Sequence, residues 1–136
     1  MMQAHIWPGL VSLAAVLVLL GMGINVGRVR HKVGVMAPAM TGDPKLERAI
    51  RIHYNTLEWT PIFLVSLWLF AIYWNDRVAA ALGVVWILGR LLYAQGYMAD
   101  PAKRAPGFLI QALATLALLF GAAGRLIYLL VTIGPV

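Results

Sequence analysis

Residues 6–26 of the chain, IWPGLVSLAAVLVLLGMGINV, contain no charged side chain. A helix that crosses a membrane needs about 20 mostly apolar residues in succession, so this stretch predicts a membrane-spanning helix. No Lys or Arg precedes it, and it is longer than the apolar region of a secretory signal peptide. We therefore expect this helix to be retained as the first element of the fold.

Three further apolar runs follow along the chain. They cover residues 59–74, residues 78–99, where only Arg90 interrupts, and residues 105–124. Asp43 followed by Pro44 is typical of a helix start, because Asp caps the first turn and Pro fits the first helical position. We expect an all-α integral membrane protein, a bundle of four transmembrane helices at residues 6–27, 44–74, 77–99 and 105–131, in one domain of residues 1–136.

The composition also favours a membrane protein. Of the 136 residues, 62% are hydrophobic and 12% are charged. Soluble domains are about 45–50% apolar, and a soluble chain of this length has too much surface to hide the excess, which argues against a soluble enzyme. The chain has no Cys, which excludes disulfides, Cys nucleophiles and Cys metal ligands. His5, His31 and His53 are too far apart in the sequence to suggest a metal site.

The distribution of basic residues predicts the orientation in the membrane. Lys and Arg gather on the cytoplasmic side of membrane proteins. Eight basic residues lie in or beside the first and third connections: Arg28, Arg30, Lys32, Lys45, Arg48, Arg51, Lys103 and Arg104. We therefore expect both termini outside the cytoplasm and connections one and three inside it. Topology explains the net charge of +6 without nucleic acid as a partner.

Polar residues form a stripe on each of the two middle helices. On the second helix, residues 48, 51, 55 and 58 fall within an arc of about 80°, at 100° per residue. The two stripes consist of Arg48, Arg51, Asn55 and Glu58 on the second helix, and of Arg90, Tyr93 and Tyr97 on the third. Arginine side chains suit carboxylates and a carboxylate suits an ammonium group, so the set would fit a small zwitterion with several carboxylates. The alternative is that the arginines contact anionic lipid headgroups.

Glu58 and Arg90 are expected at a similar depth in the membrane. Each lies about 21–24 Å from the end at which the second and third helices connect, at 1.5 Å per residue. Charged groups inside a membrane need partners, so we expect Glu58 and Arg90 to pair, directly or through a ligand. A purely structural salt bridge that sets the helix register is an equally simple explanation.

Two motifs stand out on the middle helices. The first is ERAIRIHYNTLEWTP at residues 47–61, with the spacing E-R-x-x-R-x-x-x-N-x-x-E-x-x-P. The second is Gly89-Arg90, Tyr93 and Gln95-Gly96-Tyr97, followed by Arg104 and Pro106. Both resemble motifs of the MAPEG family, the membrane-associated proteins in eicosanoid and glutathione metabolism. The resemblance covers nearly the whole chain. The layout of residues 93–104 looks closest to the leukotriene C4 synthase-like branch, although Phe108 stands where several members have tyrosine.

The resemblance implies a homotrimer that binds glutathione between neighbouring subunits at the cytoplasmic boundary. Glutathione would be the cosubstrate, and a lipophilic electrophile would arrive from the membrane lipids. By motif position, the glutathione-binding residues are Arg51, Asn55, Glu58, Tyr93 and Tyr97, together with Arg28 or Arg30 at the end of the first helix. Arg104 matches the loop arginine that favours the thiolate and is the catalytic candidate, with Arg48 and Arg90 in supporting positions. A nearby cation lowers the pKa of a thiol from about 8.5 and so raises its nucleophilic fraction.

Three functions therefore remain open. The first is a membrane glutathione transferase or peroxidase. The second is a small four-span transporter that uses Glu58 as a proton-coupled binding group, although so many arginines beside the carboxylate do not suit a cation carrier. The third is a non-catalytic lipid-binding or scaffold protein with the same fold. Turnover of glutathione would support the enzyme, and transport driven by a proton gradient would support the transporter. Binding of glutathione without turnover would support the non-catalytic protein.

Overall fold

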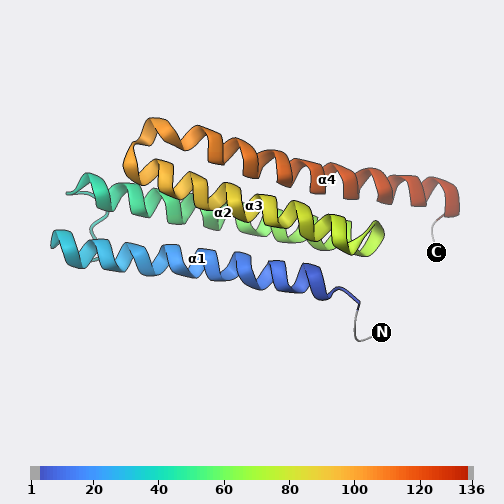
Figure 1. The fold of residues 1–136 in the computed structure, drawn as a ribbon, viewed down its shortest axis with the longest axis horizontal. Coiled ribbons are helices and arrows are strands. Elements are labelled where there is room, and N and C mark those ends of the chain that lie inside the picture. Colours follow the sequence, from blue (N-terminus) through green and yellow to red (C-terminus); the bar gives the residue numbers. More distant parts are fainter. Residues whose placement is uncertain (1–3, 135–136) are drawn as a thin grey trace.

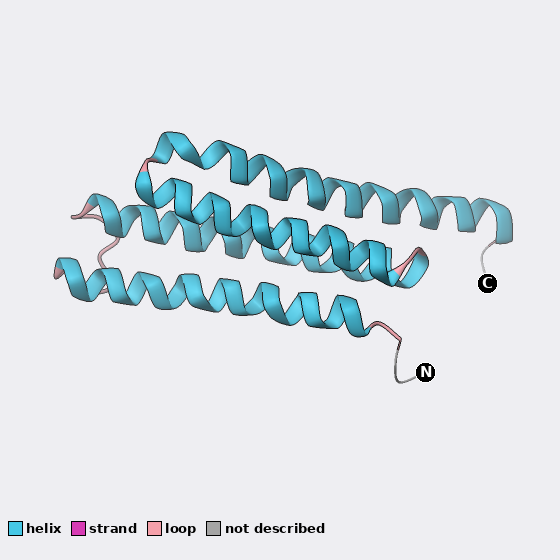
Figure 2. Ribbon diagram, viewed as in Figure 1, coloured by secondary structure: helices cyan, strands magenta, loops and turns pink. Residues whose placement is uncertain are grey.

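The computed structural model describes residues 4–134, which form four long helices and one short one. They are α1 (Ile6–Val33), α2 (Pro44–Tyr73), α3 (Asp76–Ala99), the 3-10 helix η1 (Pro101–Arg104) and α4 (Ala105–Ile133). The described residues contain no strand (Figure 2). All four long helices are long and apolar enough to cross a membrane, as the sequence predicts, with η1 continuing directly into α4.

The helices run side by side as a bundle (Figure 1). α1 packs on α2 and α3, and α4 packs on the same two helices. The α1–α2 connection and the α3–α4 connection lie at one end of the bundle, which we call the connection end (Figure 1). The α2–α3 turn, the start of α1 and the end of α4 lie at the opposite end, which we call the turn end.

The helix boundaries follow from local capping. The carboxylate of Asp43 accepts hydrogen bonds from the backbone nitrogens of Lys45 at 2.8 Å and Leu46 at 3.3 Å, as expected for the start of α2. α1 extends to Val33, beyond the expected end at residue 27. Its last turn contains basic residues, which favour a helix C-terminus, and it stops at Gly34, whose φ of 73° suits glycine. The apolar run predicts only where the membrane span ends, whereas the helix continues beyond that point to Val33.

Aromatic packing and close backbone approach hold the bundle together. Phe63 on α2 stacks on Trp86 on α3, with ring centroids 4.1 Å apart and ring planes 5° apart. α3 and α4 approach most closely at two glycines: a Cβ on Gly89 would lie 2.7 Å from the Gln111 nitrogen, and one on Gly107 would collide with the Tyr93 backbone. Many large apolar side chains point outward, among them Leu17 and Phe120, as lipid-facing helices require.

Candidate functional site

A cavity at the connection end brings together five of the polar residues singled out in the sequence. Its volume is about 260 Å³, and we call it the polar cavity. It is lined by Arg51 and Asn55 from α2, Tyr93 and Tyr97 from α3, Arg104 from η1, and Phe108 from α4. Part of each helical stripe therefore lines one cavity, together with Arg104 from the α3–α4 connection.

Aromatic rings form one wall of the polar cavity and hold Arg104 at its rim. Tyr93 is buried and meets Tyr97 edge to face, with ring centroids 5.6 Å apart. The Arg104 guanidinium carbon lies 5.7 Å from the Tyr97 ring centroid. Its Nη1 also donates to the Pro101 carbonyl at 2.9 Å, so the short helix η1 fixes its position. Arg104 remains exposed and available to a ligand.

Arg90 lies behind the polar cavity and is fully buried. Its Nη1 donates to Asn55 Oδ1 at 2.8 Å and to Thr56 Oγ1 at 3.2 Å. Its guanidinium carbon lies 4.9 Å from the Tyr93 ring centroid and 5.7 Å from that of Trp86. Arg90 therefore contacts two cavity-lining side chains without lining the cavity itself.

The expected direct pair between Glu58 and Arg90 is wrong. Between residues 4 and 134 the structure shows no ion pair between them, because Arg90 points toward Asn55 and Thr56. Glu58 is exposed on the outer surface of α2 and does not line the polar cavity. The two groups share a depth but face different directions. Pairing through a ligand stays a prediction.

Arg48 holds the end of α3. Its Nη1 donates to the carbonyls of Met98 at 3.1 Å and Ala99 at 3.4 Å. Carbonyls in the last turn of a helix have no partner inside the helix, so a cation there stabilises the helix end. Arg48 therefore joins α2 to the end of α3, and its supporting role for the site stays a prediction.

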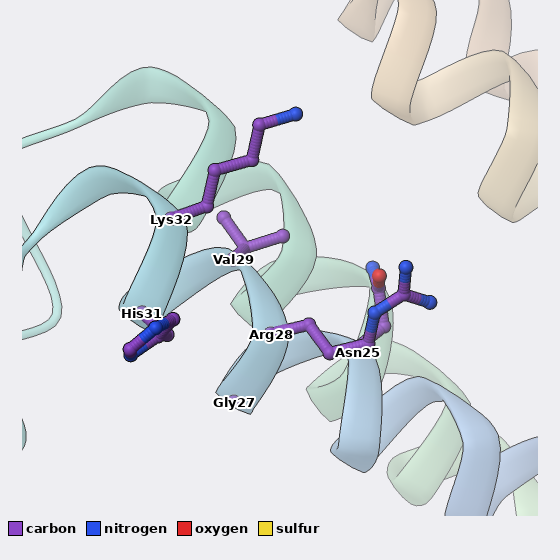
Figure 3. Close-up of a pocket in the computed structure, with 6 residues that line it drawn as sticks. All are labelled: Asn25, Gly27, Arg28, Val29, His31 and Lys32. Atoms are coloured by element: carbon purple, nitrogen blue, oxygen red, sulfur yellow. The ribbon is translucent and has the colours of Figure 1, made fainter.

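The basic end of α1 lies apart from the polar cavity. Arg28 lines a separate open cavity of about 610 Å³ together with Asn25, His31 and Lys32. Figure 3 shows the side chains that line this cavity, with Lys32 extending from the last turns of α1. Arg30 instead donates to the carbonyls of Val35 and Ala39 and so holds the α1–α2 connection. Within one chain, neither arginine joins the polar cavity, and their role in binding glutathione stays a prediction.

Sequence reasoning missed two buried polar residues, Thr56 and Gln111. Thr56 is fully buried and accepts from Arg90. Gln111 is also fully buried, and neither end of its amide finds a partner within residues 4–134. The sequence does contain a signal for Gln111, because it is a single amide side chain within an apolar run. Thr56 had no such signal, since a threonine in an apolar helix commonly bonds to its own backbone, as Thr56 does to Ile52 at 2.8 Å.

An apolar cavity adjoins the polar one. Its volume is about 710 Å³, and it shares Arg104 and Phe108 with the polar cavity. Its other lining residues are Ala102, Ala105, Pro106 and Leu109, at the start of α4. The two side chains in common separate a charged space from an apolar one, which is the arrangement needed to bring a polar and a lipophilic reactant together.

Comparison with known proteins adds independent information. The sequence model of the MAPEG family matches residues 8–124. An uncharacterized protein of Synechocystis sp. is 50% identical over 117 residues, which cover 86% of this chain and 85% of the relative. Microsomal glutathione S-transferase 2 of Homo sapiens is 44% identical over 103 residues, 74% of this chain and 69% of the relative. Leukotriene C4 synthase of Cavia porcellus is 37% identical over 123 residues, 80% of this chain and 82% of the relative.

Proposed function

Because this chain belongs to the MAPEG family, we propose that it is a membrane enzyme that uses glutathione as a cosubstrate. The relatives named as a glutathione transferase and a leukotriene C4 synthase support this class of reaction. The observation that carries the proposal is the polar cavity, where Arg51, Asn55, Tyr93, Tyr97 and Arg104 come together.

The donors of the polar cavity suit glutathione. The tripeptide carries two carboxylates, one of which the guanidinium group of Arg51 can bind through paired hydrogen bonds. The hydroxyls of Tyr93 and Tyr97 and the amide of Asn55 add neutral partners on the same wall. The thiol would then lie near Arg104, whose positive charge lowers the thiol pKa and favours the thiolate.

A second subunit would complete the site. Glu58 is a charged group on the outer surface of a membrane-spanning helix, where it is costly without a partner. In the homotrimer that the family resemblance implies, glutathione would lie between neighbouring subunits, with its ammonium group against Glu58. Arg28 or Arg30 at the end of α1 would reach the same boundary. The excess of Lys and Arg at the connection end favours its placement in the cytoplasm.

The apolar cavity would hold the second reactant. A lipophilic electrophile can enter from the lipid and lie against Pro106, Phe108 and Leu109. The thiol proton would pass to solvent, and the thiolate sulfur would attack an electrophilic carbon and form a carbon–sulfur bond. The bond that breaks at that carbon, to a leaving group or within an activated double bond or epoxide, would carry away its electron pair. The resulting anion would take up a proton from solvent. Arg104 and Phe108 lie at the boundary of both cavities, so the two reactants would meet there.

The proposal is tested by titrating the detergent-purified protein with glutathione and following the ultraviolet absorbance of the thiolate. We expect a saturable thiolate signal in the wild-type protein and its loss in Arg104→Ala, with glutathione still bound. Arg77→Ala is the matched control, because Arg77 lies at the turn end, and it should leave the signal unchanged. Absence of both a thiolate signal and a calorimetric heat of binding in the wild-type protein would refute the proposal. Proton-driven transport lost in Glu58→Gln would then favour a transporter.

A further inference from the structure

The buried guanidinium of Arg90 touches the polar cavity only through other side chains. Arg90 is 0% exposed and does not line the cavity. Its Nη1 lies 2.8 Å from Asn55 Oδ1, and its guanidinium carbon lies 4.9 Å from the Tyr93 ring centroid. Arg90 therefore makes no direct contact with the cavity, and its hydrogen bond and ring contact reach the cavity through Asn55 and Tyr93.

The contact with Arg90 decides which end of the Asn55 amide faces the cavity. A guanidinium group can only donate hydrogen bonds, so the amide atom that pairs with it must be the carbonyl oxygen. Asn55 lines the cavity, whereas Arg90 lies behind it. The amide nitrogen Nδ2 is then the end left for the cavity, and it finds no protein acceptor within residues 4–134. An unrestrained amide could present either end.

The positive charge of Arg90 also favours an acceptor group in the polar cavity. Arg90 has no carboxylate partner in the described part of the chain, and its Nε and Nη2 have no hydrogen-bond partner there. A buried cation is poorly screened, so its field reaches the adjacent cavity and favours a negative or electron-rich group. An apolar residue of similar size would stabilise the α2–α3 contact at least as well. Helix packing alone therefore does not account for an arginine at this position.

We propose that Arg90 is a positioning residue that holds the Asn55 amide with Nδ2 toward the polar cavity, so that this corner binds an acceptor oxygen. The ligand group would be a carboxylate or peptide carbonyl of glutathione, and its ammonium group would be excluded from this corner. The inference about the ligand rests on the proposed function. The inference about the orientation of Asn55 does not, and the two are tested separately.

The orientation is tested without any ligand. The chain has only three asparagines, Asn25, Asn55 and Asn75. Labelling asparagine with ¹⁵N gives three side-chain amide signals in an NMR spectrum of the protein in detergent, and Asn55→Ala identifies the one of interest. We expect Arg90→Met to shift that signal and to speed its exchange with solvent, while Arg90→Lys leaves it nearer the wild-type position. Arg77→Met is the matched control, because Arg77 is exposed at the start of α3, at the turn end away from Asn55.

The effect on the ligand is tested by a double-mutant cycle on the dissociation constant of glutathione. Loss of one hydrogen bond to a charged ligand group weakens binding about tenfold, so Arg90→Met and Asn55→Ala should each weaken it by about that factor. If Arg90 acts through Asn55, the double variant is also about tenfold weaker, because coupled residues are not additive. The dissociation constant of Arg90→Lys for glutathione should remain within about threefold of the wild-type value. A double variant that binds glutathione about a hundredfold more weakly than wild type, which is the product of the two single effects, would overturn the proposal.

Asn55→Asp tests the same point in a protein that keeps Arg90. Arg90 would hold one carboxylate oxygen, and the other would face the cavity as an acceptor. We therefore expect Asn55→Asp to bind glutathione more weakly than Asn55→Ala does, because two acceptor oxygens repel. Binding equal to or tighter than wild type would show that this corner takes the ammonium group, and would overturn the proposal even if Arg90→Met does not fold.

If the protein does not use glutathione, the experiments give a different pattern. Adding glutathione to the wild-type protein would then not shift the side-chain amide signal of Asn55 at any concentration. A shift of that signal in Arg90→Met would still support the orienting role, while the assignment of the ligand oxygen to glutathione would fall. An Asn55 signal unmoved by Arg90→Met overturns the positioning role whether or not glutathione binds.

Discussion

Two arginines near the polar cavity, Arg104 and Arg90, differ in how deeply their side chains are buried. Arg104 is exposed at the rim of the polar cavity, where it can meet a ligand directly. Arg90 is fully buried and reaches the cavity only through Asn55 and Tyr93. An exposed guanidinium can bind a carboxylate or favour a thiolate at little desolvation cost, whereas a buried one can only orient and polarise its neighbours.

The ring of Tyr97 should matter for Arg104 independently of its hydroxyl. Tyr97→Phe keeps the ring beneath the Arg104 guanidinium, whereas Tyr97→Leu removes it. A cation–π contact near the surface is worth about 0.5–1 kcal/mol, so kcat/KM of Tyr97→Leu should be about two- to fivefold below that of Tyr97→Phe. Steady-state kinetics with glutathione and a model electrophile measures the difference. Tyr128→Leu serves as the control, because its ring contacts Arg125 at the turn end. Equal values for the two Tyr97 variants would argue against the ring contact.

At the scale of elements, the polar cavity depends on how closely α3 and α4 approach. Gly107 at the start of α4 lies against the backbone of Tyr93, and Gly89 on α3 lies against the backbone of Gln111. Small residues at both crossing points let the two helices come together, as they commonly do in membrane bundles. This close packing brings Phe108 toward Tyr93, with ring centroids 6.1 Å apart, and so closes the cavity on the α4 side.

Gly107→Ala should therefore damage both stability and the site. Its Cβ would collide with the backbone of Tyr93, and a backbone neighbour cannot rotate away as a side chain can. Overpacking of this kind costs about 1–3 kcal/mol. We expect a lower thermal unfolding midpoint in detergent and weaker glutathione binding. In Gly124→Ala, where nothing lies within 4 Å, the midpoint should stay the same or rise, because Ala favours a helix over Gly. A Gly107→Ala protein as stable as wild type would contradict this account.

At the scale of the whole molecule, the two ends of the bundle have different tasks. The connection end contains both cavities of the proposed reaction. The turn end is closed by contacts between α4 and the α2–α3 turn, where Arg125 Nε donates to the Tyr73 carbonyl at 3.1 Å and Trp74 Nε1 donates to the Gly121 carbonyl at 2.7 Å. The Arg125 guanidinium also lies 5.5 Å from the Trp74 ring centroid.

Arg125→Ala should reduce stability without affecting ligand binding. The lost hydrogen bond and cation–π contact together are worth about 1–2 kcal/mol, so the thermal unfolding midpoint should fall. The dissociation constant for glutathione should stay at the wild-type value, because Arg125 lies at the end of the bundle away from the polar cavity. Arg77→Ala, on the exposed start of α3 at the same end, should change neither quantity. A weaker affinity in Arg125→Ala would show that the two ends are coupled.

Local periodicity determined the elements and the two stripes. Apolar runs long enough to span a membrane predicted the four helices, and spacings of three and four residues placed Arg51 with Asn55 and Tyr93 with Tyr97 on common faces. These features depend only on the geometry of one helix, so the sequence alone contains them. Arg104 was identified differently, by the resemblance of its loop to that of the MAPEG family and not by periodicity.

Tertiary packing decided which side chains meet across helices. Depth along the helix axes placed Glu58 level with Arg90, but depth does not say which face each helix turns to its neighbour. The rotation of α3 against α2 directs Arg90 to Asn55 and Thr56 and leaves Glu58 outside. That rotation results from side chains packed along whole helices, such as Phe63 on Trp86, and from the glycine contacts of α3 with α4. Contacts of this kind join residues far apart in the chain, so no local pattern in the sequence contains them.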